Sequence, residues 1–193
     1  MMLKTTLLTA AFALGAGAAL AEQAAYQFDT SHSQIVFNYE HLGFSTTTGM
    51  FSGIEGTIAF DAEDPAASSV EARFPLASLM TGDKGRDEHF LSPDLFGSEA
   101  SAPEVTFAST GIEVTGENTA LITGDLTLNG VTKEVVLDTV LNQQGSHPME
   151  NKPWLGFNAT TTLVRSDFNL GMFAPAVSDD VKVAISVEAM AAE

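Results

Sequence analysis

The chain has 193 residues, of which 45% are hydrophobic and 17% are charged, and it contains no cysteine. This length and apolar content indicate one folded domain rather than a disordered chain. The lack of cysteine excludes disulfides, a thiol nucleophile and cysteine-ligated metal sites. The formal net charge is -17 with eight basic residues, which excludes a nucleic-acid partner, because phosphate contacts need clustered Lys and Arg side chains.

The first 21 residues have the layout of a secretory signal peptide. Lys4 gives a positive start, residues 5–20 are uncharged and mostly apolar, and Ala19 and Ala21 place small residues before Glu22. We expect cleavage after Ala21 and a periplasmic mature domain of residues 22–193. A transmembrane anchor is the alternative, but the run is short and glycine-rich for a span of about 20 strongly apolar residues. We therefore expect a chain that is not inserted in the membrane. Its acidic body should be repelled by anionic headgroups, so adsorption to a lipid surface is not expected either.

The first half of the mature chain alternates apolar and polar residues with a period of two, which predicts strands with one apolar face. The apolar sets in this half are Ile35, Phe37 and Tyr39, then Ile58 and Phe60, then Val70, Ala72 and Phe74.

A charged segment interrupts this alternation. Residues 82–91 contain six charged or histidine side chains and two glycines, and they predict a short helix or a structured loop. Ser92 and Pro93 follow as the N-cap and first position of a second helical turn, which are the places that serine and proline favour. The sequence therefore predicts a short helical insert between strands.

The second half returns to alternation. Residues 105–113 predict one strand, and residues 120–128 and 131–142 predict a hairpin with Asn129 and Gly130 at its tip, because both residues tolerate the positive φ of a type I′ turn. Further strands are expected at 155–163 and 181–188. About eight antiparallel strands with one apolar face fit a barrel or a sandwich. The interior of an eight-stranded barrel is filled by side chains or holds one small ligand, and alternation does not decide between these.

Histidines and acids supply the only candidates for catalysis or metal binding. A metal-dependent or acid/base enzyme would be built around His32, His41, Asp87 and His89. Their spacing is loose, and the chain has 25 acidic residues, so we expect these groups to be structural. No catalytic residue, required metal or cofactor is expected.

Arg165 is notable because arginine is scarce in this chain. It follows the 155–163 strand and stands beside Asp167. We expect an ion pair with Asp167 or another acid that steadies the end of this strand. The alternative is that Arg165, with His32 and His41, meets a polar headgroup at the mouth of a barrel.

The large number of phenylalanines is the remaining signal. Twelve Phe follow the signal peptide, whereas Tyr and Trp are rare, so the interior should be apolar and poor in hydrogen-bond donors. Core packing explains most of them, but several large apolar residues stand beside glycines at expected loop ends, where exposure would be costly. An apolar tunnel is therefore a hypothesis, with these candidates for its lining: Phe37, Phe44, Met50, Phe60, Phe90, Phe96, Phe107, Phe157, Ala159, Phe168, Met172 and Phe173.

Motifs along the mature chain resemble the YceI-like family of exported, lipocalin-like polyisoprenoid-binding proteins. The opening Y-x-x-D-x-x-H-S spans residues 26–33, and G-D-L-T-L-N-G-V-T-K spans residues 124–133. The insert R-D-x-H-F spans residues 86–90, and the closing R-S-D-F and S-D-D-V span residues 165–168 and 178–181. Asn169 replaces the glycine that the family usually has after R-S-D-F, but asparagine also tolerates positive φ.

The resemblance implies an all-β fold, namely an extended eight-stranded antiparallel lipocalin-like barrel with a short helical insert. It also implies an elongated pocket for a polyprenyl chain, an isoprenoid quinone or a similar long-chain amphiphilic lipid. The family is often dimeric, so a homodimer stays open, and the resemblance supplies no catalytic residues. A lipid carrier is the favoured interpretation; the enzyme and a structural or stress-related interaction module are the alternatives.

Overall fold

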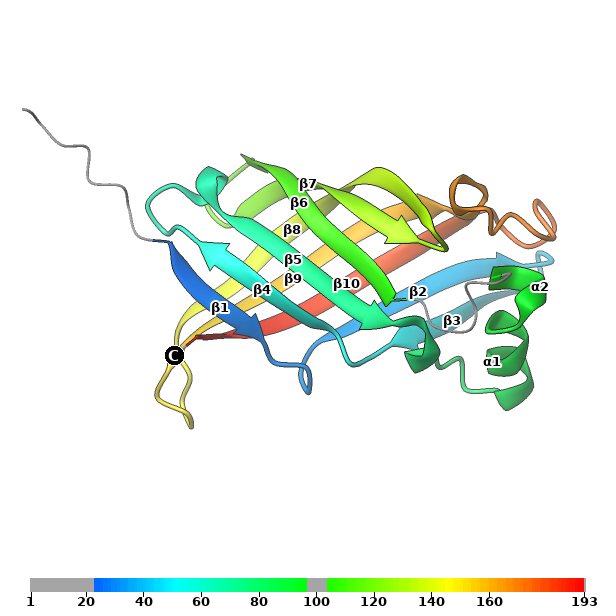
Figure 1. Cartoon of the computed structure of the whole chain (residues 1–193), viewed down its shortest axis with the longest axis horizontal. Helices are drawn as coiled ribbons and strands as arrows, with labels where there is room; N and C mark the ends of the chain where they lie inside the picture. Colours follow the sequence, from blue (N-terminus) through cyan, green and yellow to red (C-terminus); the bar gives the residue numbers. More distant parts are fainter. Residues whose placement is uncertain (1–22, 97–103, 193) are drawn as a thin grey trace, which may run out of the picture.

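The computed structural model describes residues 23–96 and 104–192. Its strands form a single antiparallel sheet (Figure 1). Two short helices, α1 (Lys84–Phe90) and α2 (Pro93–Phe96), lie between the fifth and sixth strands. The strands are β1 (Ala24–Phe28), β2 (Gln34–His41), β3 (Ser45–Phe51), β4 (Glu55–Phe60), β5 (Ser69–Pro75), β6 (Glu104–Val114), β7 (Thr119–Leu128), β8 (Val131–Ser146), β9 (Pro153–Val164) and β10 (Asp180–Ala191).

These ten segments form a closed barrel of eight strands. The segments β1 and β2 both pair with β10, β1 opposite its last residues and β2 opposite its first half. They are thus one strand interrupted at residues 29–33. The segment β4 pairs with β1, and β3 pairs with β2. The segments β3 and β4 are thus also one strand, interrupted at residues 52–54. The predicted eight-stranded antiparallel barrel with a short helical insert is confirmed.

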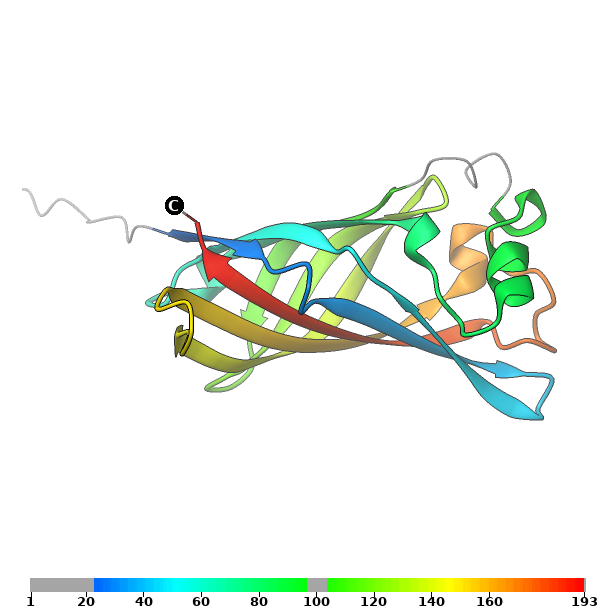
Figure 2. The same ribbon diagram turned by 90° about the horizontal axis from the view of Figure 1, so that it is seen from below.

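The two ends of the barrel differ (Figures 1 and 2). At the terminal end, β1 begins and β10 ends, and the connections are residues 61–68, 115–118 and 147–152. At the helix end lie α1, α2, the turn at residues 42–44 and the segment 165–179, which begins with the 3₁₀ helix η4 (Arg165–Phe168). These two names are used for the ends below.

The helical insert completes the wall beside β3, which pairs with β2 on one side only. After the 3₁₀ helix η2 (Leu76–Ser78), the backbone of Met80 exchanges two hydrogen bonds of 2.9 Å with the backbone of Met50. The side chain of Asp83 then accepts a hydrogen bond from the amide of Arg86 and caps α1. Ser92 precedes α2 as expected, but its hydroxyl donates to the carbonyl oxygen of His89.

The predicted hairpin is confirmed, with β7 and β8 joined by Asn129 and Gly130. Their φ angles are 52° and 69°, which is the left-handed pair that a type I′ turn requires. The side-chain amide of Asn129 also donates to the carbonyl of Phe168, at 2.9 Å. The turn therefore fixes the register of β7 and β8 and ties their tip to the segment that follows β9.

The proposed signal peptide and its cleavage after Ala21 lie outside the described residues. Within residues 23–96 and 104–192, none of the helices is long and apolar enough to cross a membrane.

Candidate functional site: an apolar cavity inside the barrel

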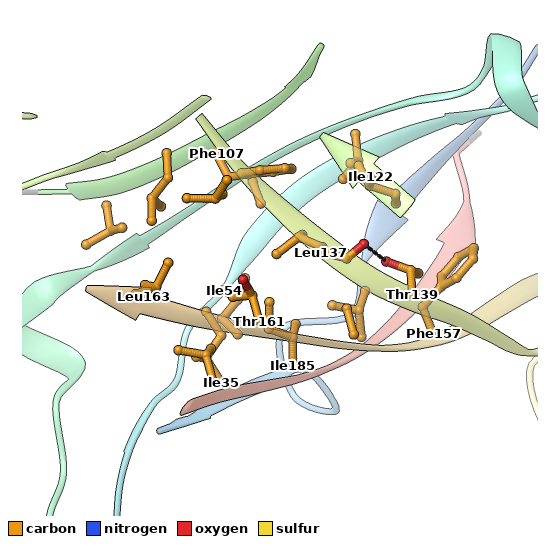
Figure 3. A pocket seen from close by; sticks show the side chains of 18 of the residues that line it. Ile35, Ile54, Phe107, Ile122, Leu137, Thr139, Phe157, Thr161, Leu163 and Ile185 are labelled. Carbon is orange, nitrogen blue, oxygen red and sulfur yellow. Dashed lines mark hydrogen bonds between the residues drawn. The ribbon is translucent and has the colours of Figure 1, made fainter. Parts of the chain in front are cut away.

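The apolar faces of the strands surround an internal cavity of about 370 Å³. Figure 3 shows lining side chains from different strands pointing toward one another, among them Ile35, Ile122, Leu137 and Ile185. At the helix end the lining includes residues of α1, α2 and η4, and at the terminal end it includes Pro65 and the 116–119 turn. The cavity therefore extends along the barrel, and its volume lies in the range of about 300–1,000 Å³ that is usual for small-molecule pockets.

Phenylalanines form a large part of the lining. Ten of the twelve Phe that follow residue 21 border the cavity, and toward the helix end several are in ring contact. Phe51 lies 5.0 Å from Phe74 and 5.4 Å from Phe37 between ring centroids. Among the tunnel candidates, the structure places eight on the lining: Phe37, Phe60, Phe90, Phe96, Phe107, Phe157, Ala159 and Phe168.

The structure places the other four candidates away from the lining. Phe44 is 89% exposed at the β2–β3 turn, and Met172 and Phe173 are exposed in the segment 165–179. Met50 lies on β3 opposite Met80. The glycines beside these residues do not mark a pocket, because they belong to loop tips and to the strand β3 at the sheet edge, where the neighbouring side chains point outward.

Two glycines on the wall leave room for flat aromatic rings. A Cβ atom on Gly49 would overlap the ring of Phe37 on the neighbouring strand, and one on Gly124 would overlap the ring of Phe107. Glycine inside a strand is typical of such close approach. Because each ring lies against a bare backbone rather than across the barrel, the lumen stays open.

Polar atoms are sparse in the lining. In the middle of the barrel, Thr139 and Thr161 are the hydroxyl-bearing residues, and the Thr139 hydroxyl donates to the carbonyl of Leu137 at 3.3 Å. Among the described lining residues, the charged side chains are Glu117 at the terminal end and Arg165 at the helix end. An interior of this kind favours an apolar chain, because a polar group placed there would lose its hydrogen bonds to water.

Arg165 binds backbone carbonyls rather than an acid, which corrects the expected pair with Asp167. Its guanidinium donates to Leu170 at 2.6 Å, Met172 at 3.2 Å, Val177 at 3.1 Å and Ser178 at 2.9 Å. Burial lowers the pKa of Arg165 below its usual value, while the charge of Asp179 acts in the opposite direction. Arginine remains protonated under such shifts, so all its N–H groups stay available as donors. The four hydrogen bonds connect distant parts of the segment 165–179 and stabilise its loop conformation.

The same segment has two further supports. Asp179 accepts hydrogen bonds from the amide and the hydroxyl of Ser166, at 2.8 and 2.6 Å, and these bonds lower the pKa of its carboxyl. Asn169 ends η4 with a φ of 59°. The expectation that asparagine preserves the turn at this position is confirmed.

The histidines of the enzyme hypothesis lie outside the cavity lining and are not brought together. His32 lies in the break between β1 and β2, whereas His41 ends β2 and bridges Val177. His89 contacts the ring of Phe173 at 6.3 Å between centroids. Asp87 accepts hydrogen bonds from the amide and hydroxyl of Thr81, so it is occupied in holding the start of the insert.

One group in the described part of the chain has the spacing of metal ligands. It consists of Asp29, His32 and Glu188, whose ligand atoms lie within 4.8 Å of one another. His32 Nδ1 lies 2.6 Å from Asp29 Oδ2, and Glu188 accepts a hydrogen bond from the indole of Trp154 at 3.0 Å. These partners explain the cluster as a polar network that joins the β1–β2 break to β9 and β10.

The cavity is also lined by aliphatic residues that are not among the tunnel candidates predicted from the sequence. The alternation of β6 to β8 could have identified these residues, because they occupy every second position on the apolar face. They are Ile112, Ile122, Leu126, Val135, Leu137 and Leu141.

Residues 26–189 match the YceI-like domain family. The chain belongs to the YceI-like family. Among curated relatives, a UPF0312 protein of Pseudomonas savastanoi pv. phaseolicola is 41% identical over 174 residues, covering 88% of each chain. A UPF0312 protein of Pectobacterium atrosepticum is 38% identical over 190 residues, covering 97% of each chain.

Solved structures from other bacteria have the same fold. BcnA of Burkholderia cenocepacia matches with a TM-score of 0.74 at 24% identity, over 83% of this chain and 98% of that one. The YceI protein of Campylobacter jejuni matches at 0.70 and 29% identity, over 80% and 90%. A polyisoprenoid-binding domain of Saccharophagus degradans matches at 0.66 and 15% identity, over 88% and 100%.

Proposed function

We propose that this YceI-like protein is a binding or carrier protein that holds a long-chain isoprenoid, a quinone or a similar amphiphilic lipid, and that it performs no catalysis. The observation that carries the proposal is the composition of the cavity: apolar walls along the barrel with the charged side chains Glu117 and Arg165 at opposite ends. The polyisoprenoid-binding domain of Saccharophagus degradans shares this fold, which supports the ligand class.

A lumen of this kind selects by the length of the chain more than by the headgroup. At about 0.3 kcal/mol for each enclosed non-hydrogen atom, one five-carbon isoprene unit adds about 1.5 kcal/mol, which is about tenfold in affinity. Affinity should therefore rise stepwise until the lumen is full and then level off.

A chain-length series tests the proposal. Delipidated protein is titrated with isoprenoid alcohols of two, three, four and more units, and matched quinones with the same tails test the headgroup. We expect affinity to rise about tenfold per unit up to a plateau, with a small effect of the headgroup. Affinity that does not depend on tail length would contradict the proposal, as would purified protein from which organic extraction releases no stoichiometric lipid.

We further propose that the protein works in the periplasm after cleavage behind Ala21. The support is the signal-peptide layout of the first 21 residues. Intact-mass measurement of periplasmic protein should give Glu22 as the first residue. Retention of Met1 in an envelope fraction would contradict the proposal.

A further inference from the structure

The helix end exposes large apolar side chains from two neighbouring loop tips. Leu42 is 50% and Phe44 89% exposed in the β2–β3 turn, and Met172 is 40% and Phe173 56% exposed in the segment 165–179. Exposed apolar groups gathered in one place mark an interaction site more often than scattered ones do. These four residues are called the tip patch below.

The two loops of the tip patch are held side by side. The amide of Leu42 donates to the carbonyl of Ala176 at 2.8 Å, and His41 bridges Val177. The ring of Phe173 lies 6.3 Å from that of His89 in α1, so the insert borders the same patch. Figure 2 shows the turn, the segment and the helices at one end of the barrel.

Two of these residues combine an exposed apolar side chain with an unfavourable backbone conformation. Leu42 has a φ of 56° and Phe173 a φ of 66°, in the left-handed region where glycine or asparagine would be easier to accommodate. A bulky apolar side chain at such a position gains nothing from water. A partner that covered these side chains would remove their apolar surface from water.

We propose that the tip patch docks the protein on a zwitterionic phospholipid bilayer. The proposal rests on the proposed function, since the bilayer is the store from which a carrier of this kind takes its lipid. The cavity supports it, because its helix-end lining includes Phe96, Arg165 and Phe168, on the elements that surround the tip patch. Docking there places the end of the lumen against the membrane.

Charge favours the same orientation. The loops of the terminal end, residues 61–68, 115–118 and 147–152, carry five acidic residues and one lysine. At the helix end, α1, α2 and the segment 165–179 carry five acidic residues against Lys84, Arg86 and Arg165, so this end is less acidic by two charges. The overall charge of -17 still opposes anionic headgroups, so a zwitterionic surface is the one that the helix end fits.

The area of the tip patch favours a bilayer over a second copy of the chain. With about 200 Å² for a large side chain that is fully exposed, the four residues offer on the order of 500 Å². A stable protein interface buries about 800 Å² on each partner. Protruding side chains on loop tips can instead enter the headgroup region of a bilayer without a matching surface.

Sedimentation with phosphatidylcholine vesicles tests the proposal. We expect the wild-type protein to sediment with the vesicles and Phe44→Ser to lower its partition coefficient about tenfold or more, since the variant loses the transfer of a large apolar side chain out of water. Met149→Ser is the matched control, because Met149 is 78% exposed at the terminal end, and it should leave partitioning unchanged. Phe44→Trp should preserve it, and adding anionic phosphatidylglycerol should weaken it.

Two further measurements separate docking from lipid binding. Isoprenoid delivered without vesicles should bind equally well to the wild type and to Phe44→Ser. If the wild type sediments with vesicles, Phe44→Ser does not, and neither protein binds isoprenoid, then the docking proposal stands and the proposed function fails. Partitioning that is equal in wild type and Phe44→Ser would overturn docking. So would protein that stays free of vesicles and forms dimers that Phe44→Ser dissociates, which would assign the tip patch to a second copy.

Discussion

At the terminal end of the barrel, strand pairing and buried side chains complete the structure, whereas at the helix end a long loop does so, held by the buried side chains of Phe168 and Leu170 and by the guanidinium of Arg165. Leu155 and Ala189 are fully buried at the terminal end, where β10 pairs with both β1 and β9. At the helix end, Arg165 binds four carbonyls of the segment 165–179. The two ends therefore resist local opening in different ways: the terminal end by continuous strand pairing, and the helix end by the contacts of one loop.

The largest effect is expected from Leu155→Ala at the terminal end. Loss of this fully buried side chain should lower the free energy of unfolding by about 2–5 kcal/mol. The matched change Leu137→Ala, on the cavity lining, should cost less in ligand-free protein, because an open lumen already leaves one side of Leu137 without packing partners. Denaturant unfolding of delipidated protein measures both. Equal losses would mean that the lumen wall is packed as tightly as the core.

The next effect is expected from Arg165→Ala at the helix end. Loss of the hydrogen bonds from a charged donor to four carbonyls should cost about 1.5–3 kcal/mol. Arg73→Ala is the control, since Arg73 pairs with Glu55 on the surface, and it should cost clearly less than Arg165→Ala. Thermal melts compare them. If Arg165→Ala kept its melting temperature while losing lipid affinity, the headgroup role would replace the structural one.

A smaller effect on stability is expected from Ala159→Phe, inside the lumen. In a packed core the added ring would cost about 1–3 kcal/mol. In an open lumen it occupies space left for the ligand, so the ligand-free melting temperature should change little while affinity for long chains falls about tenfold for each isoprene unit displaced. Affinity for the shortest chains should stay the same. A clear loss of stability with unchanged long-chain affinity would show that this face is ordinary core.

The smallest effect concerns pH and the pair of Asp29 and His32. Partial burial of Asp29 acts to raise its pKa, but hydrogen bonds from Ser31 and His32 outweigh it and lower the pKa from 3.8 to about 2. The hydrogen bond with Asp29, together with its charge, raises the pKa of His32 above 6.5. The Asp29 contribution is therefore lost as pH falls from 3.8 toward 2, and that of His32 is lost as pH rises through its raised pKa.

Melting temperatures of His32→Gln and wild type at about pH 5.5 and pH 9 measure this difference. We expect the variant to be less stable than wild type at the lower pH and nearly equal to it at the higher pH. His41→Gln is the control, because among the described residues the ion pairs do not include His41. A gap that widened toward pH 9 would contradict the assignment.

The barrel could be predicted from the sequence because alternation along a strand is a local property. Residues 155–163 and 181–188 turned their apolar sets inward as expected, and Asn129 and Gly130 formed the expected turn. The same alternation placed Phe157 and Ala159 on the lining. Phe44 and Phe173 are also phenylalanines, but they lie outside the cavity lining. Each stands in a loop, and no local sequence pattern determines the path of a loop. For Arg165 the sequence predicts an ion pair with Asp167 or another acid, whereas the partners of its guanidinium are backbone carbonyls up to 13 residues away.

By itself, the sequence determined most of the strand segments with their inward faces, the insert and the acidic, apolar character of the chain, since propensity, alternation and turn chemistry depend on neighbouring residues. It did not predict the short segments β1 and β3. The tertiary structure alone decided that the interior is a cavity of about 370 Å³ rather than a filled core. That outcome depends on how rings from distant strands lie against glycines such as Gly49 and Gly124. It also decided which apolar residues face water at the helix end, because their exposure depends on contacts between the β2–β3 turn and a segment more than a hundred residues later.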